Sequence, residues 1–342
     1  MGNTHMHILI TGASGFVGSH MVEQALACGY ETWAAVRATG SKRYLKDSRI
    51  HLIELDYTDA ATLTAQLHEH RRFHGAWDII IHCAGATRCR HKRAFYEANY
   101  KTTRRFVDTL RALDIVPRQF IYISTLGVYG PLHEVPPFRP ITDADIPHPN
   151  TVYGQSKRAA EKYLMRLPDF PYVIVRPTGV YGPRDKDYRL LVDAIRHHVE
   201  LRLGYRRRLM TFVYVRDLVQ AVFCVISHGV VRRSYFVTDG NVYTARDFGR
   251  VVRKALGNPF VLHITLPLWI GFMAATLCDV AGRIMGKSFV LNGDKYHILK
   301  QRNWTCDITP LVNELDYRPQ YSLEKGIGEM LSSLSSHEEV EQ

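Results

Sequence analysis

The sequence predicts an α/β protein built on a doubly wound parallel sheet, with a smaller second region intercalated into it. Two observations support this fold class. Short apolar runs alternate with helical patterns through the first half of the chain, which is typical of a parallel sheet covered on both faces. In addition, a glycine-rich turn at 12–18 follows the first apolar run and opens the first helical pattern.

Length and composition agree with this fold class. The chain has 342 residues, enough for about two domains at roughly 150 residues each. Apolar residues make up 46% and charged residues 23%, which excludes a disordered, collagen-like or coiled-coil architecture. The formal net charge of +11 favours anionic partners such as phosphates, nucleic acid or acidic lipid, without choosing among them.

The elements of the first half follow in order. Residues 7–11 predict a buried strand, and residues 16–28 predict a helix that Gly29 ends. Further strands are expected at 31–37, 50–55, 78–83, 119–124 and 171–176. Further helices are expected at 59–71, 92–113 and 151–167. This alternation indicates a Rossmann-type domain that spans 6–177.

Beyond residue 177 the pattern is less regular. We expect a helix at 188–200, a basic loop at 202–208, a strand-to-helix step at 212–227, a strand at 234–238 and a helix at 244–256. The apolar segment 259–278 predicts a core or lid helix, with an interfacial segment or a membrane span as alternatives. We expect this substrate-binding region, 178–335, to be intercalated with the first domain.

The glycine turn predicts a nucleotide-binding site. Gly12 permits the tight turn, Gly15 lets a pyrophosphate approach the helix N-terminus, and Gly18 lets the helix pack closely on the sheet. The same turn contributes three further candidates for cofactor binding, Ser14, Phe16 and Val17.

The second strand indicates which dinucleotide is bound. NAD-binding proteins place an acidic residue about 20 residues past the last glycine, where it bonds the ribose 2′-hydroxyl. Here the strand ends at Arg37, and no Asp or Glu occurs from 32 to 46. A guanidinium can stack on adenine and pair with a 2′-phosphate. We therefore expect NADP(H), with NAD(H) as the alternative, and we expect no metal site.

A second motif consists of Tyr153 and Lys157, which share one face of the predicted helix because they are four residues apart. A neighbouring ammonium favours the phenolate and so lowers the pKa of a tyrosine. Tyr153 can then exchange a proton with a substrate hydroxyl while a bound nicotinamide exchanges hydride.

These motifs together resemble the extended short-chain dehydrogenase/reductase superfamily, also described as the NAD-dependent epimerase/dehydratase family. The glycines have its G-x-x-G-x-x-G spacing, and YISTLGVYG at 122–130, VRPTGVYGP at 175–183 and LDYRP at 315–319 follow in its order. The resemblance covers residues 6 to 330. WTCD at 304–307 and the apolar segment 259–278 look most like the branch of 3β-hydroxysteroid dehydrogenases and dihydroflavonol reductases.

The resemblance implies roles for individual residues. Thr125 would bond the substrate oxygen, Tyr153 would be the acid/base, and Lys157 would tune it and hold the cofactor ribose. Asp56 stands where the superfamily reads the adenine amino group, and a helix N-cap with Thr58 is the alternative. The remaining cofactor-binding candidates are Tyr57, Ala84, Gly85, Ala86, Ser124, Pro177 and Val180.

These roles predict an NADP(H)-dependent oxidoreductase acting on a secondary alcohol or ketone, steroid-like or otherwise apolar. Leu126 and Gly127 cannot do the acid–base work of a dehydratase, and Met210 stands where nucleotide-sugar epimerases clamp the diphosphate with arginine. A nucleotide-sugar 4-epimerase stays an alternative, because the arginines at 206–208 can compensate. A second alternative is a non-catalytic, redox-sensing dinucleotide-binding protein.

The remaining expectations concern partners. We expect a small-molecule substrate, a homodimer through the helices at 92–113 and 151–167, and peripheral membrane contact through 259–285 as an option. No nucleic-acid partner is expected, because no DNA-reading or aromatic-basic stacking motif occurs. The N-terminus lacks signal-peptide features and none of the six cysteines forms a C-x-x-C pair, so we expect a cytoplasmic protein.

Overall fold

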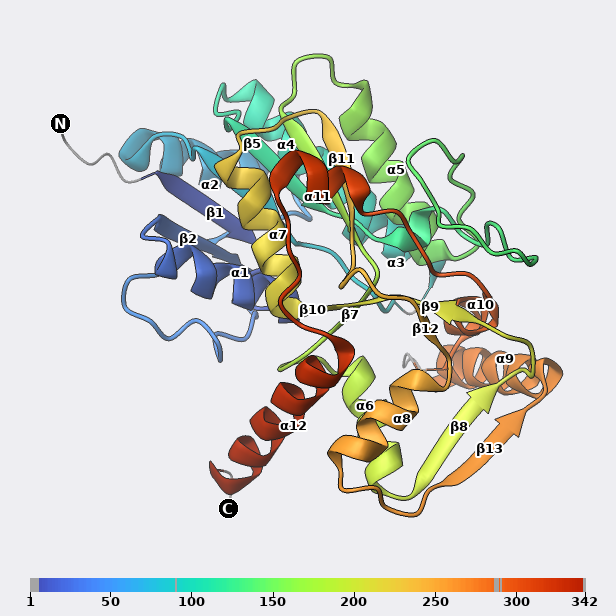
Figure 1. Ribbon diagram of the computed structural model, residues 1–342. Helices are drawn as coiled ribbons and strands as arrows, with labels where there is room; N and C mark the ends of the chain where they lie inside the picture. Colours follow the sequence, from blue (N-terminus) through green and yellow to red (C-terminus); the bar gives the residue numbers. More distant parts are fainter. Residues whose placement is uncertain (1–5, 90, 286–288, 290, 341–342) are drawn as a thin grey trace. The chain divides into compact units, whose positions relative to one another are not determined.

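The structure is a computed structural model that describes residues 6–89, 91–285, 289 and 291–340 (Figure 1). The chain forms two compact units and passes repeatedly from one to the other. The first unit takes its described residues from 1–124, 156–176 and 219–235, and the second takes them from 125–155, 177–218 and 236–342.

A seven-stranded sheet has the order β11-β6-β5-β4-β1-β2-β3. The pairs of neighbours from β6 to β3 in this order are all parallel. The direction in which successive strands are added reverses beside β1, so the carboxyl ends of β1 and β4 meet at a topological switch point. The strands are β1 (His7–Thr11), β2 (Glu31–Val36), β3 (His51–Glu54), β4 (Ile79–His82), β5 (Gln119–Ile123), β6 (Tyr172–Pro177) and β11 (Arg233–Val237).

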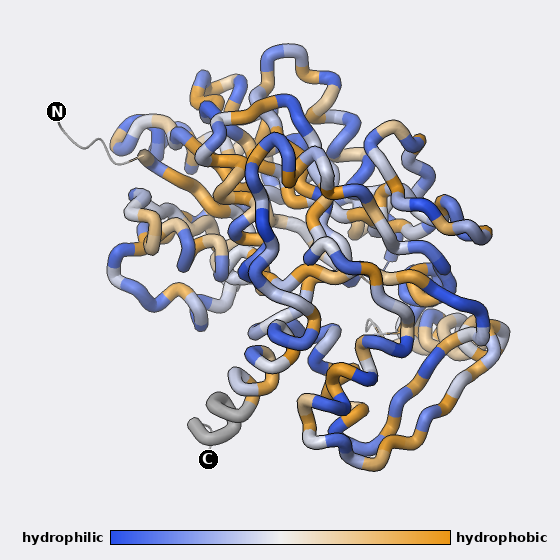
Figure 2. The backbone as a smooth tube through the Cα atoms, in the orientation of Figure 1, coloured by the Kyte–Doolittle hydropathy of each residue, from blue (hydrophilic) through white to orange (hydrophobic). Residues whose placement is uncertain are grey.

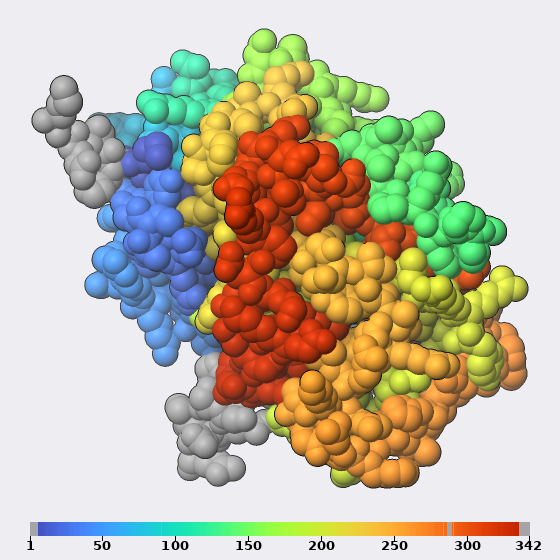
Figure 3. All heavy atoms as spheres, viewed as in Figure 1, coloured from blue at the N-terminus to red at the C-terminus, as the bar shows by residue number. Residues whose placement is uncertain are grey.

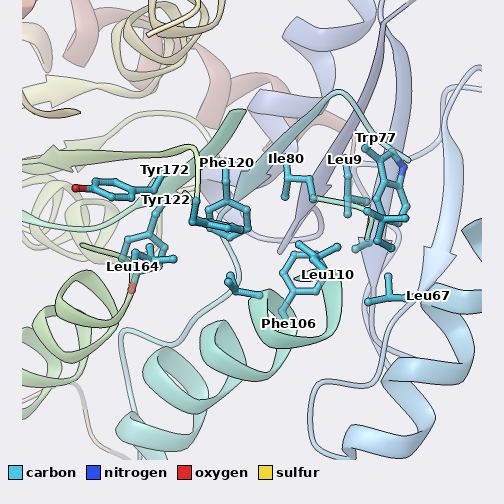
Figure 4. Close-up of a cluster of buried hydrophobic side chains, with 14 of the residues drawn as sticks. Leu9, Leu67, Trp77, Ile80, Phe106, Leu110, Phe120, Tyr122, Leu164 and Tyr172 are labelled. Carbon is cyan, nitrogen blue, oxygen red and sulfur yellow. The ribbon is translucent and has the colours of Figure 1, made fainter. Parts of the chain in front are cut away.

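Helices cover this sheet as the alternating pattern predicts. One face carries a core of strand and helix side chains, shown in Figure 4, that includes Leu9, Ile80 and Phe120 from the strands and Phe106 and Leu164 from the helices. Ile8 and Ile10 alternate with Leu9 and are fully buried too, so both faces of β1 are covered. Figure 2 shows these central strands as mostly hydrophobic runs. The helices are α1 (Phe16–Ala27), α2 (Ala60–His74), α4 (Thr102–Ala112), α5 (Val152–Arg166) and α7 (Val215–Ser227).

The predicted helix at 92–113 is divided. It consists of α3 (Lys92–Phe95), a π-helical stretch η1 (Tyr96–Lys101) and α4. A π-helix widens the turn and cannot be distinguished from an α-helix by hydrophobic periodicity alone.

The second unit has its own core, in which α6, α8 and α12 pack around aromatic residues such as Tyr181, Phe212 and Tyr214. Its short strands pair two by two as β7–β10, β9–β12 and β8–β13. The elements are η2 (Leu126–Val128), β7 (Gly179–Tyr181), α6 (Asp187–Arg196), β8 (Val199–Leu203), β9 (Leu209–Met210), β10 (Phe212–Tyr214), β12 (Tyr243–Thr244), α8 (Asp247–Ala255), β13 (Leu262–Leu266), α9 (Leu268–Met285), α10 (Gly293–Lys300), α11 (Thr309–Leu315) and α12 (Leu323–Val340).

Two expectations for this region are wrong. The helix at 188–200 ends at Arg196, and β8 begins three residues later, inside what we expected to be helix and basic loop. The segment 259–278 is not one helix, because β13 precedes Pro267 and α9 follows it. Nor is α9 a core helix, since its large apolar side chains are exposed. In the described part of the chain, no helix combines the length and hydrophobicity that a membrane span needs.

Candidate active site

The turn between β1 and α1 needs glycine at two of its three glycine positions. Gly12 has φ +65°, and a Cβ there would lie 2.8 Å from the backbone of Cys83 and Ala84. A Cβ on Gly18 would lie 2.8 Å from the carbonyl carbon of Gly12. Gly15 is exposed and caps α1 without a side-chain hydrogen bond. The first amides of α1 can therefore receive an anion, as helix N-termini commonly do.

Arg37 directly follows β2 and is exposed. Its carbonyl accepts a hydrogen bond of 2.8 Å from the Gly40 amide, which closes a tight turn. Ser41, Lys42 and Arg43 continue this turn and are exposed as well. The end of β2 therefore presents positive charge, which suits a phosphate group.

Asp56 and Tyr57 follow β3. Asp56 accepts hydrogen bonds from the Thr58 amide (2.8 Å) and hydroxyl (2.6 Å), and these bonds lower the pKa of its carboxyl. Asp59, and not Asp56, is the N-cap of α2. The Tyr57 ring packs edge-on against Phe106 in the core, and burial raises the pKa of its phenol.

Asn99 fastens the segment 84–86. Its side chain accepts from the Ala86 amide (2.8 Å) and donates to the Ala86 carbonyl (3.0 Å) and to the Ser156 hydroxyl (2.9 Å). A Cβ on Gly85 would lie 2.7 Å from the Asn99 amide oxygen, so the segment needs glycine there. Asn99 is fully buried and belongs to the π-helical η1. The side chain of Asn99, which lies in this π-helical turn, therefore contacts both the segment 84–86 and Ser156 of α5.

His82 links β1 and β4 to η1 and α4. Its Nδ1 lies 2.9 Å from the Thr11 hydroxyl and its Nε2 lies 3.0 Å from the Thr103 hydroxyl. Burial lowers the pKa of His82 to about 3, and the charge of Lys157 adds to this effect. His82 is therefore neutral and packed.

Lys157 is buried in the first unit. Its ammonium donates to the Ile123 carbonyl at 2.8 Å and lies 4.8 Å from the centre of the Tyr122 ring. Burial lowers the pKa of Lys157 to about 8, although Cys83 and Glu161 act in the opposite direction. The ammonium is thus held in a cation–π and carbonyl environment with little water.

Ser124, next in the chain after β5, serves a buried ion pair. Its hydroxyl donates to the Glu161 carboxylate at 2.6 Å. Arg176 donates to both oxygens of the same carboxylate, at 3.0 and 3.1 Å, and Arg158 donates to one of them at 2.9 Å. No periodicity or motif marks this cluster, whose members lie in β6, in α5 and directly after β5.

Tyr153 lies in the first turn of α5. The carboxylate of Asp294, in α10, accepts the amides of Val152 and Tyr153 at 3.0 Å each, and the Thr151 hydroxyl accepts the Gly154 amide at 3.0 Å. These three bonds satisfy the first-turn amides of α5. Burial raises the pKa of the Tyr153 phenol to about 12, the opposite of the shift that we expected from Lys157.

The other candidates lie at strand ends in the second unit. Thr125 is the N-cap of η2, and its hydroxyl accepts the Gly127 amide at 3.1 Å. Pro177 ends β6, and Val180 pairs with Val213 of β10. Tyr153 and Lys157 occupy one continuous helix, α5, which begins in the second unit and continues in the first.

A model of the NAD dependent epimerase/dehydratase family matches residues 8–237. The chain belongs to this family. It is an enzyme of the extended short-chain dehydrogenase/reductase type, and the predicted fold class and family resemblance are confirmed.

Members of the epimerase/dehydratase family with different activities are similar to this chain. UDP-glucose 4-epimerase of Vibrio cholerae is 27% identical, over 93% of this chain and 92% of that protein. GDP-6-deoxy-D-mannose reductase of Pseudomonas aeruginosa is 27% identical, over 70% and 77%. Sterol-4-alpha-carboxylate 3-dehydrogenase of Saccharomyces cerevisiae is 22% identical, over 95% and 97%.

A solved structure of the same fold is that of UDP-glucose 4-epimerase from Thermotoga maritima with UDP-glucose. It superimposes with a TM-score of 0.77 at 21% identity, covering 97% of this chain and 99% of that one.

Proposed function

We propose that this enzyme is an NADP(H)-dependent oxidoreductase that interconverts a secondary alcohol and a ketone. The observation that carries the proposal is the environment of Lys157, which follows Tyr153 by one helical turn on α5. Its buried ammonium is held 2.8 Å from the Ile123 carbonyl. Proton exchange by a phenol needs a cation close to it, and the spacing of four residues puts Tyr153 and Lys157 on the same face of α5.

The first unit fits a dinucleotide. Gly12 and Gly18 let the turn and α1 pack closely on the strand ends, and the exposed Gly15 leaves the N-terminus of α1 open to a ligand. Arg37 would hold a 2′-phosphate, and the first amides of α1 would hold the pyrophosphate. We assign the other cofactor contacts to Asp56, the segment 84–86 and the backbone near Pro177 and Val180.

The catalytic work falls to three side chains. When bound, the dinucleotide supplies or accepts a hydride at its nicotinamide ring. Tyr153 keeps its proton at neutral pH because its pKa is about 12, and it would give this proton to the substrate oxygen during reduction. Lys157 would stabilise the phenolate left behind, and Thr125 would orient the substrate oxygen.

The substrate that we propose is apolar, and steroid-like compounds are the first to test. Leu126 and Gly127 provide no acid or base for dehydration. The similarity to a sterol dehydrogenase over 95% of this chain supports this class.

A nucleotide-sugar 4-epimerase is the second candidate, which the 27% identity to the Vibrio cholerae epimerase favours. Met210 in β9 offers no guanidinium for a diphosphate. Arg208 does not replace it in this arrangement, because it donates to the Leu299 carbonyl.

A homodimer through α4 and α5 is also part of the proposal. Both helices carry polar outer residues, among them Asp108, which accepts from Tyr163 at 2.6 Å. Light scattering on the purified protein measures this state directly.

The test combines cofactor binding with turnover. Arg37→Asp is expected to weaken NADPH binding by about a hundredfold, because a charge-assisted phosphate contact is replaced by repulsion, and to change NADH binding far less. Equal losses for both cofactors would refute the choice of NADP(H).

Turnover decides among the three functions. We expect ketone reduction with net NADPH use, abolished by Tyr153→Phe. Turnover of UDP-sugars without net NADPH use would establish the epimerase. Cofactor binding without turnover of steroid, flavonoid-like or UDP-sugar substrates, unchanged by Tyr153→Phe, would establish the redox-sensing protein.

A further inference from the structure

Helix α9 exposes a stripe of large apolar side chains. Six of them lie along one face and are between 48% and 81% exposed: Trp269, Phe272, Met273, Leu277, Val280 and Ile284. Counted from Trp269, the others follow at three, four, eight, eleven and fifteen residues, which is the spacing of a single helix face. A helix that packs on a protein core normally turns such a stripe inward. In α9 the large apolar side chains face outward instead.

The inner face of α9 explains this orientation. It carries small residues, and Gly271 and Ala275 are buried. The side chain of Leu203 occupies the space that a Cβ on Gly271 would need. Small residues on the inner face hold the helix close to β8 while its large residues point outward.

The β8–β13 ribbon, made of β8 and β13, continues this surface. Its strands pair in parallel, so Leu201 lies beside Ile264 and Glu200 lies beside His263. The polar side is turned inward, where the buried Glu200 bonds Arg202 at 2.8 Å and its carboxylate fills the space beside Gly249 of α8. The apolar side is open, with Leu201 61% and Leu262 52% exposed. In Figure 3 the orange segment that includes β13 lies at the surface of the second unit.

Positive charge adjoins this apolar surface. The chain from 199 to 210 contains four arginines and one glutamate. Arg206 and Arg207 are exposed in the loop after β8, beside the exposed Tyr205. This loop starts at Gly204, against which Leu268 of α9 packs, so the two arginines lie near the end of α9 that carries Trp269. Aromatic and apolar side chains next to arginine are typical of proteins that bind membrane interfaces.

We propose that α9 and the β8–β13 ribbon bind the surface of an anionic lipid bilayer. The helix lies in the plane of the interface with its exposed stripe among the acyl chains, while Arg206 and Arg207 contact lipid phosphates. Anionic lipid has the charge opposite to the protein's net +11, whereas a second copy would bring the same charge to the contact. This proposal does not depend on the proposed enzymatic function.

Vesicle flotation of the full chain tests it. We expect the protein to float with vesicles of phosphatidylcholine and phosphatidylglycerol, and far less with phosphatidylcholine alone. The triple variant Trp269→Glu, Phe272→Glu, Leu277→Glu should lose binding by about tenfold or more. Arg206→Glu with Arg207→Glu should lose about fivefold per arginine and abolish most of the salt dependence.

Matched controls separate binding from unfolding. Phe73→Glu on α2 changes a side chain that is 65% exposed, as Trp269 is 62% exposed, and it should float like the parent protein. Because the substituted side chains are exposed, all variants should unfold at nearly the parent temperature. In the parent, the fluorescence of Trp269 should shift to shorter wavelength with anionic vesicles, and Trp269→Phe should remove this shift.

Three results would overturn the proposal. The first is a parent protein that does not float with anionic vesicles. The second is flotation that the triple variant leaves unchanged. The third is an oligomer in lipid-free solution that the triple variant dissociates, since a second copy would then cover this surface. A dimer through α4 and α5 would survive the triple substitution.

Discussion

Lys157 illustrates how burial adjusts the chemistry of one side chain. Its pKa of about 8 lies well below the ordinary 10.5, while the pKa of Tyr153 lies near 12. Between pH 6 and 10 the group that titrates is therefore the ammonium and not the phenol. Over this interval the phenol is available as a proton donor, and its stabilising cation is lost.

This difference predicts an alkaline decline in activity. In the proposed reaction, kcat/KM for ketone reduction should fall above about pH 8, because the phenolate loses its neighbouring charge. A pH–rate profile from pH 6 to 10 measures it. A profile that is flat to pH 10 would contradict the role given to Lys157.

The contribution of Lys157 to stability changes with pH in the direction opposite to the change in activity. The unfolded chain keeps this proton up to about pH 10.5, whereas the folded protein loses it near pH 8. Between these values the unfolded state binds more protons, so the contribution of Lys157 to the free energy of unfolding rises with pH. The decline in activity can thus be separated from unfolding.

Single residues could be predicted from the sequence where the backbone requires a particular residue type. Gly12 and Gly18 were predicted because a turn and a close helix demand them, and their surroundings bear this out. The pairing of Tyr153 with Lys157 on one helix followed from their spacing. Asp294 and Glu161 were missed, because their partners lie far away in sequence and no periodicity marks such contacts.

At the scale of elements, α5 obtains its N-terminal cap from a remote helix. Asp294 of α10 binds the amides of Val152 and Tyr153. In turn, Asp279 of α9 accepts the Gly293 amide at 3.0 Å at the start of α10. The orientation of the Tyr153 backbone is therefore coupled to α10, and α10 is coupled to α9.

We predict that Asp294 is a positioning residue. Asp294→Asn removes the charge at the N-terminus of α5 and one of two amide contacts, which should lower stability by about 1 kcal/mol. If the proposed role of Tyr153 holds, kcat should fall by about tenfold with KM little changed, since small displacements of a reacting group are costly.

The control for Asp294 is Asp316→Asn, which changes a side chain that is 76% exposed in the same unit. Thermal unfolding and steady-state kinetics of both variants give the comparison. Equal effects of the two substitutions would contradict a specific role for Asp294.

Helices and strands could be predicted where their apolar residues follow a single clear periodicity. The strands and helices of the first unit lie within a few residues of their predicted places because most of them have a buried apolar run or stripe, although β3 is largely exposed. Two elements were not predicted, the π-helical η1 and the strand β13. Hydrophobic periodicity does not separate a π-turn from an α-turn, which explains why η1 was missed. The run 259–278 contains no charged residue that would indicate where one element ends.

At the scale of the whole molecule, the main constraint on dividing the chain into independent parts is that the two units are interleaved along it. Each unit has three chain segments, so the chain passes between the units five times. Composition gave no sign of where these passages occur, because the chain has no linker of distinct composition. Residues 219–235 return to the first unit, where the Gln119 amide donates to the carbonyls of Val225 and Val230 at 3.1 and 2.8 Å.

This interleaving predicts the behaviour of a fragment. Residues 1–177 alone lack β11 and the partners of Gln119, so they should show no cooperative thermal unfolding by circular dichroism. A fragment of residues 1–240 keeps β11 and these partners, and it serves as the comparison. A cooperative transition of the shorter fragment at the temperature of the full chain would show that the returning segment is dispensable.

The exposed apolar side chains of α9 and of the β8–β13 ribbon also affect the solubility of the purified protein. Apolar area in contact with water is the least soluble part of any molecule, and sulfate strengthens its tendency to associate. Mild detergent should therefore keep this protein dispersed, and ammonium sulfate should precipitate it sooner than the variant that carries three glutamates on α9.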